Sequence, residues 1–314
     1  MGIYKPQQSG FPEIGGAGEL IYTSVRFSGY ELAYDPDGTE FIRPILDDEH
    51  RPVVKKDYDL KGHVLLYELA NLYKRINSWE DPVDSRKAVM DWCSSHIHPF
   101  NTIELADACR TLDGLDDNTI RIDGSFTFDE FMDKLSRLSC TLFYHHALRS
   151  ARLDRDTSLA RMMYYEGRFH ENYPFFERYR NLEDDEYLAR LDEDYPSHLR
   201  NLLDCVPPFE MTLQVNEDSG RVGMYAHIDT LFDICWFALS RIIATDAPPE
   251  DSDDDGPLHT NKPYICCKAC GTYLVKTGIR QQYCGNPDCQ RVRNRKKQKE
   301  HYERQKLKKA QNAD

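Results

Sequence analysis

The spacing of four cysteines near the C-terminus constrains the fold of this 314-residue chain more than any other feature. Cys267 and Cys270 form a C-x-x-C pair that is followed by Gly271. Thirteen residues further on, Cys284 and Cys289 form a C-x₄-C pair. Two thiolates at the first spacing can reach one metal ion, and the glycine lets the backbone turn tightly toward the sulfurs. Together the four sulfurs predict a tetrahedral Cys₄ metal site.

The metal predicted for this site is a single zinc ion. Four thiolates select soft metals that accept tetrahedral geometry, and mononuclear iron is the main alternative, with a redox or disulfide use of the thiols as a third. A closed Cys₄ set leaves no open coordination position, so the zinc is expected to be structural. Cys266 would give a C-x-x-x-C spacing in place of Cys267, and we interpret it as a thiol that does not bind the metal.

The distribution of charge divides the chain. The formal net charge is −13, yet residues 264–314 contain 13 Lys and Arg against four Asp and Glu. The other 263 residues contain 27 Lys and Arg against 49 Asp and Glu. The chain is therefore an acidic body with a basic tail, and the mean charge does not argue against a nucleic-acid partner.

The basic tail is predicted to form a helix that follows the second cysteine pair. Residues 290–311 contain good helix formers without Gly or Pro, and Asn286-Pro287-Asp288 can cap their start, which places Cys289 in the first turn. Apolar residues are sparse, which disfavours a membrane-surface role and leaves a solvated tail as the plain alternative. The interpretation with functional content is contact with DNA, or alternatively RNA, through counterion release. The candidate contact residues are Arg291, Arg293, Arg295, Lys296, Lys297, Lys299 and Arg304.

This C-terminal segment resembles a known family. Tyr283-Cys284 to Cys289, the basic run Arg291–Lys297 and His301-Tyr302-Glu303-Arg304 are similar to the CGNR-type zinc finger of bacterial proteins regarded as transcription regulators. In that family Gly-Asn-Arg follows the last cysteine, whereas Gln290 and Arg291 follow Cys289 here. The resemblance covers the zinc module alone. It implies DNA binding by the finger and is compatible with a helical domain before it.

The body is predicted to be mainly α, in an α+β arrangement with two small β-hairpins. Capping signals and apolar periodicity predict helices from about residue 60, including one that starts at Thr127. Residues 229–243 are apolar almost all round and are predicted to form a central core helix. A turn at Pro196 predicts two separate helices, 184–192 and 197–205. Alternating segments around Asp35-Pro36-Asp37-Gly38 and around 216–220 predict the two hairpins.

The expected domain order follows from composition. Residues 1–245 form the acidic body, of which 1–19 are Gly- and Pro-rich and expected to be loose. Residues 246–261 form a linker whose first part, Asp246–Gly256, holds six acids and two prolines. Residues 262–290 form the zinc finger and 291–314 the basic helical tail. The acidic segments offer an intramolecular partner that would mask the tail.

Compartment and reaction class are predicted from absences. Five further cysteines lie scattered in apolar segments, which suits a reducing cytoplasm, and no secretory signal or membrane span is recognised. Glu166 with His170, and His145-His146, are interpreted as ordinary polar or packed residues rather than as a catalytic set. The Walker, H-E-x-x-H, G-x-S-x-G and G-x-G-x-x-G motifs are absent, so an enzyme is not expected.

The function expected from the sequence is that of a cytoplasmic, zinc-containing, DNA-binding regulator whose body binds a ligand or a partner. The alternative is an interaction protein, in which the zinc is purely structural and the basic tail binds an acidic partner.

Overall fold

The structure of the chain is a computed structural model. The described residues are 22–45, 53–57, 62–77, 84–100, 124–165, 178–179, 181–209, 211–215, 222–226, 228, 230–246, 264–275, 277 and 281–311. Three features discussed above lie outside these residues: segment 1–19, the spacing of Glu166 and His170, and the predicted linker after Asp246.

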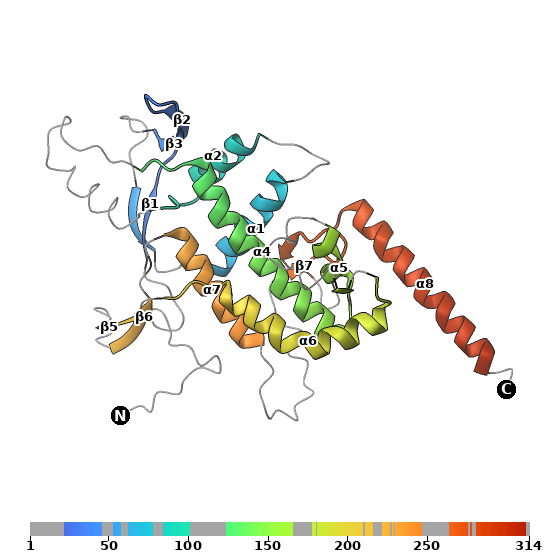
Figure 1. The fold of residues 1–314 in the computed structure, drawn as a ribbon. Helices are drawn as coiled ribbons and strands as arrows, with labels where there is room; N and C mark the ends of the chain where they lie inside the picture. Colours follow the sequence, from blue (N-terminus) through green and yellow to red (C-terminus); the bar gives the residue numbers. More distant parts are fainter. Residues whose placement is uncertain are drawn as a thin grey trace, which may run out of the picture. The chain divides into compact units, whose positions relative to one another are not determined.

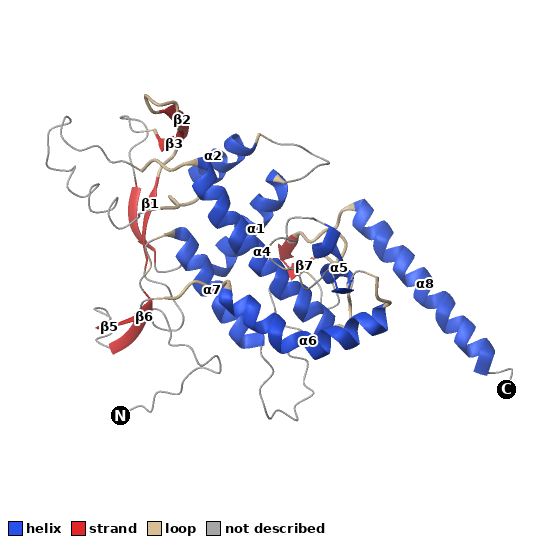
Figure 2. Ribbon diagram, in the orientation of Figure 1, coloured by secondary structure: helices blue, strands red, loops and turns tan. Residues whose placement is uncertain are grey.

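Helices dominate the described residues, as the sequence predicts, and the strands form only two-stranded antiparallel sheets (Figures 1 and 2). The helices are α1 (Gly62–Ile76), α2 (Ser85–Ser95), α4 (Phe128–Leu153), α5 (Ser158–Tyr165), α6 (Asp184–Asp204), α7 (Leu231–Asp246) and α8 (Pro287–Gln311). The strands are β1 (Tyr22–Arg26), β2 (Tyr30–Tyr34), β3 (Glu40–Pro44), β4 (Val53–Asp57), β5 (Met211–Val215), β6 (Val222–Ala226), β7 (Tyr264–Cys266) and β8 (Tyr273–Val275). Within the part of the chain that the structure describes, none of the helices is both long and apolar enough to cross a membrane.

The chain separates into two compact units. The first unit comprises residues 1–142 and 200–250, and the second comprises 143–199 and 251–314. The C-terminal cysteine segment and α8 therefore share a unit with α5, the end of α4 and most of α6.

The core of the first unit is built around α7, which is apolar almost all round, as predicted. Thr230 and Asp233 form a reciprocal capping box at its start: the Thr230 amide donates to Asp233 Oδ2 at 2.8 Å, and the Asp233 amide donates to Thr230 Oγ1 at 3.2 Å. Helix α1 packs on α7 so closely that a Cβ atom on Gly62 would lie 3.0 Å from Ile234 Cγ2. Glycine at this position lets the two backbones approach.

Both predicted hairpins are confirmed. Strands β2 and β3 pair in antiparallel register around a turn in which the Gly38 amide donates to the Asp35 carbonyl, and Gly38 has a φ of 87°. Strands β5 and β6 pair from Met211 with Ala226 to Val215 with Val222. The β1–β4 pair was not predicted, because its strands are separated by the whole first hairpin and local patterns do not reveal such pairing.

The prediction that Pro196 separates two helices was wrong. Helix α6 runs without interruption from Asp184 to Asp204, with Pro196 inside it. Packing on both sides of the proline holds the helix together: Tyr187 and Leu191 are buried before it, and His198 is fully buried after it. The His198 Nδ1 atom lies 2.8 Å from the Tyr144 hydroxyl of α4. Tertiary contacts outweigh the hydrogen bond that proline cannot donate.

Candidate metal centre and basic helix

The first cysteine pair sits in a tight turn between β7 and β8. The Cys267 amide donates to the Thr272 carbonyl at 2.9 Å, and the Gly271 amide donates to the Cys267 carbonyl at 2.7 Å. Gly271 has a φ of 69°, in the left-handed region that an L side chain rarely adopts. The glycine that follows the C-x-x-C pair thus has the role expected from the sequence, since it closes the turn that presents both sulfurs.

The second pair meets the first across this turn. The Cys284 amide donates to the Cys267 sulfur at 3.3 Å, and the Cys270 and Cys284 sulfurs lie 3.8 Å apart. The sulfurs of the four predicted ligands, Cys267, Cys270, Cys284 and Cys289, all lie within 4.8 Å of one another. A four-cysteine cluster that could hold a metal ion therefore exists where the spacing indicated.

The cluster is shielded from water at two of its four members. Cys267 is fully buried and Cys289 nearly so. A hydrogen bond with Cys270, together with burial, raises the pKa of the Cys267 thiol far above its ordinary value. Burial, with hydrogen bonds to Cys284 and Cys270, raises the pKa of Cys289 to about 12. Metal binding must therefore displace protons from these thiols.

Helix α8 begins directly at the second pair. The Asp288 amide donates to Asn286 Oδ1 at 2.8 Å, so Asn286 caps the helix, and Pro287 occupies its first position. Cys289 lies in the first turn, as predicted. A metal held by the four cysteines would be bonded to the helix itself.

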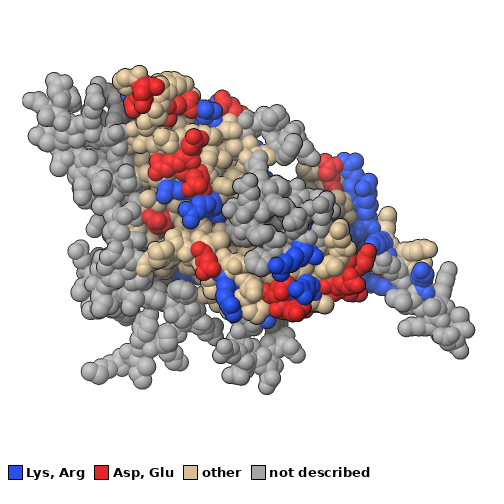
Figure 3. All heavy atoms as spheres, viewed as in Figure 1, with Lys and Arg blue, Asp and Glu red and all other residues tan. Residues whose placement is uncertain are grey.

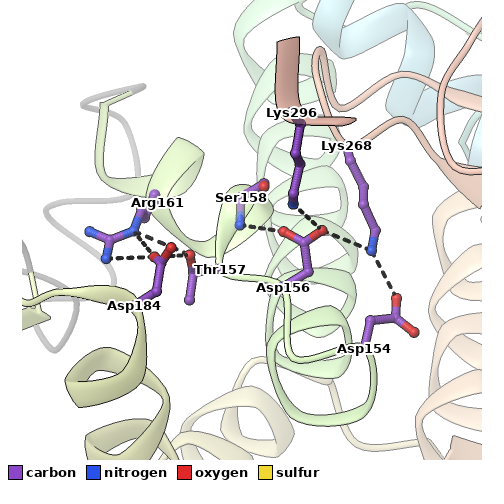
Figure 4. Close-up of polar contacts among 8 residues, drawn as sticks. All are labelled: Asp154, Asp156, Thr157, Ser158, Arg161, Asp184, Lys268 and Lys296. Atoms are coloured by element: carbon purple, nitrogen blue, oxygen red, sulfur yellow. Dashed lines mark hydrogen bonds and ion pairs between the residues drawn. The ribbon is translucent and has the colours of Figure 1, made fainter. Parts of the chain in front are cut away.

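Lys268, which lies between the first two cysteines, is almost completely buried and holds the cluster against the end of α4. Its Nζ atom is 3.2 Å from Asp154 Oδ2 and 3.0 Å from Asp156 Oδ2 (Figure 4). Only 7% of the Lys268 side chain and 10% of the Asp156 side chain are exposed. A buried ammonium group needs such partners, because an unpaired charge away from water is costly.

The backbone turn that follows α4 brings both carboxylates to Lys268. The amides of Asp154 and Asp156 both donate to the Ser150 carbonyl, and Arg155 between them has a φ of 51°. A left-handed residue just after the last helical turn is a common way to end a helix, although it strains a residue other than glycine. The turn closes α4 and starts α5 at once, because Asp156 Oδ1 also accepts from the Ser158 amide at 2.9 Å.

Asp156 also binds the basic helix. The Lys296 Nζ atom of α8 lies 2.9 Å from Asp156 Oδ2, the oxygen that Lys268 also contacts (Figure 4). Burial raises the pKa of the Asp156 carboxyl, but the Ser158 hydrogen bond and the two lysines lower it more, so the net pKa is well below its ordinary value. The carboxylate is therefore charged at neutral pH and joins α5, the cysteine turn and α8.

The other candidate contact residues of α8 lie on exposed surface. Basic side chains follow this helix on the face shown in Figure 3. Several make short-range contacts along it: Arg291 with Asp288, Arg293 with Gln290 at 3.0 Å, and Arg304 with Glu300 at 3.4 Å. Arg291, Arg293, Arg295, Lys297, Lys299 and Arg304 are all exposed. Such exposed contacts contribute little to stability.

Sequence reasoning missed the roles of Lys268, Asp154 and Asp156. Lys268 was counted only as one more charge in the basic segment. Asp156, two residues before Ser158 at the start of α5, has the local signal of a helix cap, and that signal does not reveal a partner far along the chain. Cys266, interpreted as a thiol outside the metal set, is buried and its sulfur lies 3.4 Å from the Gly271 carbonyl.

We compared the chain with protein-family models, with curated proteins and with solved structures, and no significant match was found in any of the three. The resemblance of residues 283–304 to the CGNR-type finger therefore stays a prediction.

Proposed function

We propose that this chain is a zinc-stabilised DNA-binding protein whose C-terminal helix, α8, contacts the phosphate backbone. The observation that carries the proposal is that an exposed basic helix contains Cys289, a member of the four-cysteine cluster, in its first turn. A bound metal would fix the first turn of that helix. The helix would then present its cations in a defined direction rather than as a loose tail.

The cluster suits zinc. Tetrahedral Zn–S bonds of about 2.3 Å hold sulfurs roughly 3.8 Å apart, which is the separation of the Cys270 and Cys284 sulfurs. Four thiolates around Zn²⁺ leave no position for a substrate, so the ion would hold the fold and take no part in a reaction. Such a site contributes its binding free energy to folding.

The helix suits a polyanion. Its exposed surface is cationic along most of its length, whereas the chain as a whole carries a net charge of −13. Exposed cations gain affinity for DNA by releasing condensed counterions, a gain that any DNA sequence provides. This mode of binding requires no apolar face, and apolar residues are sparse in the sequence of α8.

Binding of the zinc-loaded full-length protein to a duplex over a salt series tests the proposal. Between about 50 and 200 mM salt, log K should fall linearly with log salt, with a slope near −0.9 for each phosphate neutralised. Replacing Arg293, Arg295 and Lys297 together with Gln should make this slope shallower by up to about 2.7 and weaken binding at low salt. Absence of binding by the wild-type protein at low salt would reject the proposal.

A charge-matched control separates contact through α8 from a change in net charge. Arg43, Lys87 and Arg137 are exposed basic residues of the first unit. Their replacement with Gln removes the same charge and is expected to leave the salt slope unchanged. An equal effect of both triple variants would show that α8 has no special role.

A second candidate function is supported by the contacts of Asp156. The Lys296 side chain of α8 is partly exposed and binds the carboxylate of Asp156, so this helix can pair with acidic side chains. The chain could then dock an acidic protein through α8. Competition between duplex DNA and an acidic polypeptide such as polyglutamate decides between the two, since a protein-docking helix should prefer the polypeptide.

A further inference from the structure

Four polar residues of α8, none of them Lys, Arg, Asp or Glu, lie along one edge of the helix. Successive residues of an α-helix are rotated by about 100°, so positions i, i+4, i+7 and i+11 share one edge. Asn294, Gln298, His301 and Gln305 have this spacing, and all four are exposed. The Gln305 Nε2 and His301 Nε2 atoms lie 2.8 Å apart, so these neighbours already meet along the edge. We call these four residues the amide edge.

The opposite side of α8 faces the rest of the second unit. Cys289 is buried in the cysteine cluster, and Lys296 binds Asp156. On the same rotation, both lie roughly 130–180° from the members of the amide edge nearest to them in sequence. The contacts that anchor the helix therefore turn the amide edge outward.

Two cationic stripes flank the amide edge. Arg291, Arg295, Lys299 and Lys306 fall within about 80° of one another on one side of it. Arg293, Lys297 and Arg304 fall within about 40° of one another on the other side. A helix with a single basic face would track one phosphate backbone. Cations on both sides of a polar edge match two backbones with a groove between them.

We infer that α8 enters the major groove of duplex DNA, with its two stripes on the two phosphate backbones and the amide edge against the bases. This inference rests on the proposed function and specifies its partner. The major groove is about 12 Å wide, which admits a helix of about 10–12 Å diameter. Asn and Gln side chains can donate to and accept from an adenine there at the same time.

The length of the amide edge limits the number of base pairs that it could contact. Asn294 and Gln305 are eleven residues apart, which corresponds to a rise of roughly 16 Å along the helix. That length spans about five base pairs at 3.4 Å per step. A single chain should therefore read a short site within this span.

Selection of the full-length zinc-loaded protein on a random duplex pool tests the inference. Wild-type protein is expected to enrich a short motif that contains adenine, and to bind it more tightly than double-stranded RNA or single-stranded DNA, because the major groove of A-form RNA is too narrow for side chains to read. The double variant Asn294→Ala, Gln298→Ala should lose roughly 5- to 150-fold in preference per base contact while its salt slope stays unchanged. The double variant Arg293→Gln, Lys297→Gln should show the reverse: the same motif, weaker binding and a shallower salt slope.

The outcomes distinguish a failure of the major-groove inference from a failure of the proposed function. Because all four substituted side chains are exposed, circular dichroism and metal content should match the wild type. Duplex binding without sequence preference, or a motif that Asn294→Ala, Gln298→Ala leaves intact, overturns the major-groove inference and leaves DNA binding standing. Equal affinity for all three nucleic acids also overturns it. Failure to bind any of them at low salt overturns the proposed function itself.

Discussion

The Nζ atom of Lys268, between two cysteines of the metal cluster, lies 3.0 Å from Oδ2 of Asp156 in the turn between α4 and α5. Both side chains are buried, and the same carboxylate oxygen binds Lys296 of α8. One acidic residue therefore sets the position of both the cysteine turn and the basic helix. The two elements that the sequence identified by composition meet at a residue that composition does not single out.

We predict that Asp156→Asn destabilises the second unit. The substitution leaves the buried Lys268 with Asp154 alone and removes the partner of Lys296. Removing one member of a buried ion pair costs roughly 3–5 kcal/mol, and the remaining contact with Asp154 places the expected loss near 3 kcal/mol. The free energy of unfolding from urea titration, followed by circular dichroism, measures this loss.

The exposed pair of the same turn provides the control. The Arg155 Nη1 and Asp192 Oδ2 atoms lie 2.7 Å apart, and about half of each side chain is exposed. Asp192→Asn should change the free energy of unfolding by less than about 1 kcal/mol. Equal effects of the two substitutions would mean that the buried contact has no special structural importance.

The cysteine cluster was predictable from sequence because metal ligation requires fixed spacings, and both pairs lie within one short segment. The ion pairs that join Lys268 to Asp154 and Asp156 could not be predicted, because α5, α6 and α7 separate these residues from Lys268 in the sequence. The same limit applies to the β1–β4 pair. The rule that proline ends a helix gave a wrong prediction at Pro196, because burial of Tyr187, Leu191 and His198 keeps α6 continuous. Periodicity and a capping signal were sufficient to predict α4, and an almost continuous apolar composition was sufficient to predict α7.

The metal assignment gives a prediction with an internal control. Cys284→Ser should remove about one zinc ion per chain and destabilise the C-terminal segment, because a hydroxyl is a poor substitute for a thiolate ligand. Cys266→Ser should keep the zinc, since that sulfur approaches the Gly271 carbonyl rather than joining the cluster. Elemental analysis of protein purified without added metal measures both. Loss of zinc from Cys266→Ser with retention in Cys284→Ser would require a different ligand set.

Replacement of Pro196 is predicted to raise the free energy of unfolding, whereas Asp156→Asn is predicted to lower it. Because α6 is continuous and Pro196 is exposed, Pro196→Ala restores an amide donor without disturbing the core. Proline in a helix interior is about 3 kcal/mol less favourable than alanine, and we expect a gain of about 1–3 kcal/mol in the free energy of unfolding. Ser197→Ala, next to it and also exposed, should change stability by less than about 0.5 kcal/mol. A loss of stability in Pro196→Ala would show that α6 needs the proline.

Buried histidines predict how stability depends on pH. Burial lowers the pKa of His98 to about 3, and that of His198 to about 4 against the opposing charge of Asp194. At pH 7 both are neutral in the folded state and mostly neutral in the unfolded state. As pH falls below the unfolded pKa of about 6.5, only the unfolded chain takes up these protons, so stability should decrease until pH reaches the folded pKa. In His98→Phe the new ring would lie among Phe27, Tyr30 and Phe126. This variant should reduce the slope of stability against pH between pH 6 and 4.5 by up to about 1.4 kcal/mol per pH unit. The exposed His301→Gln should keep the wild-type slope, and an equal reduction in both variants would contradict the assignment to His98.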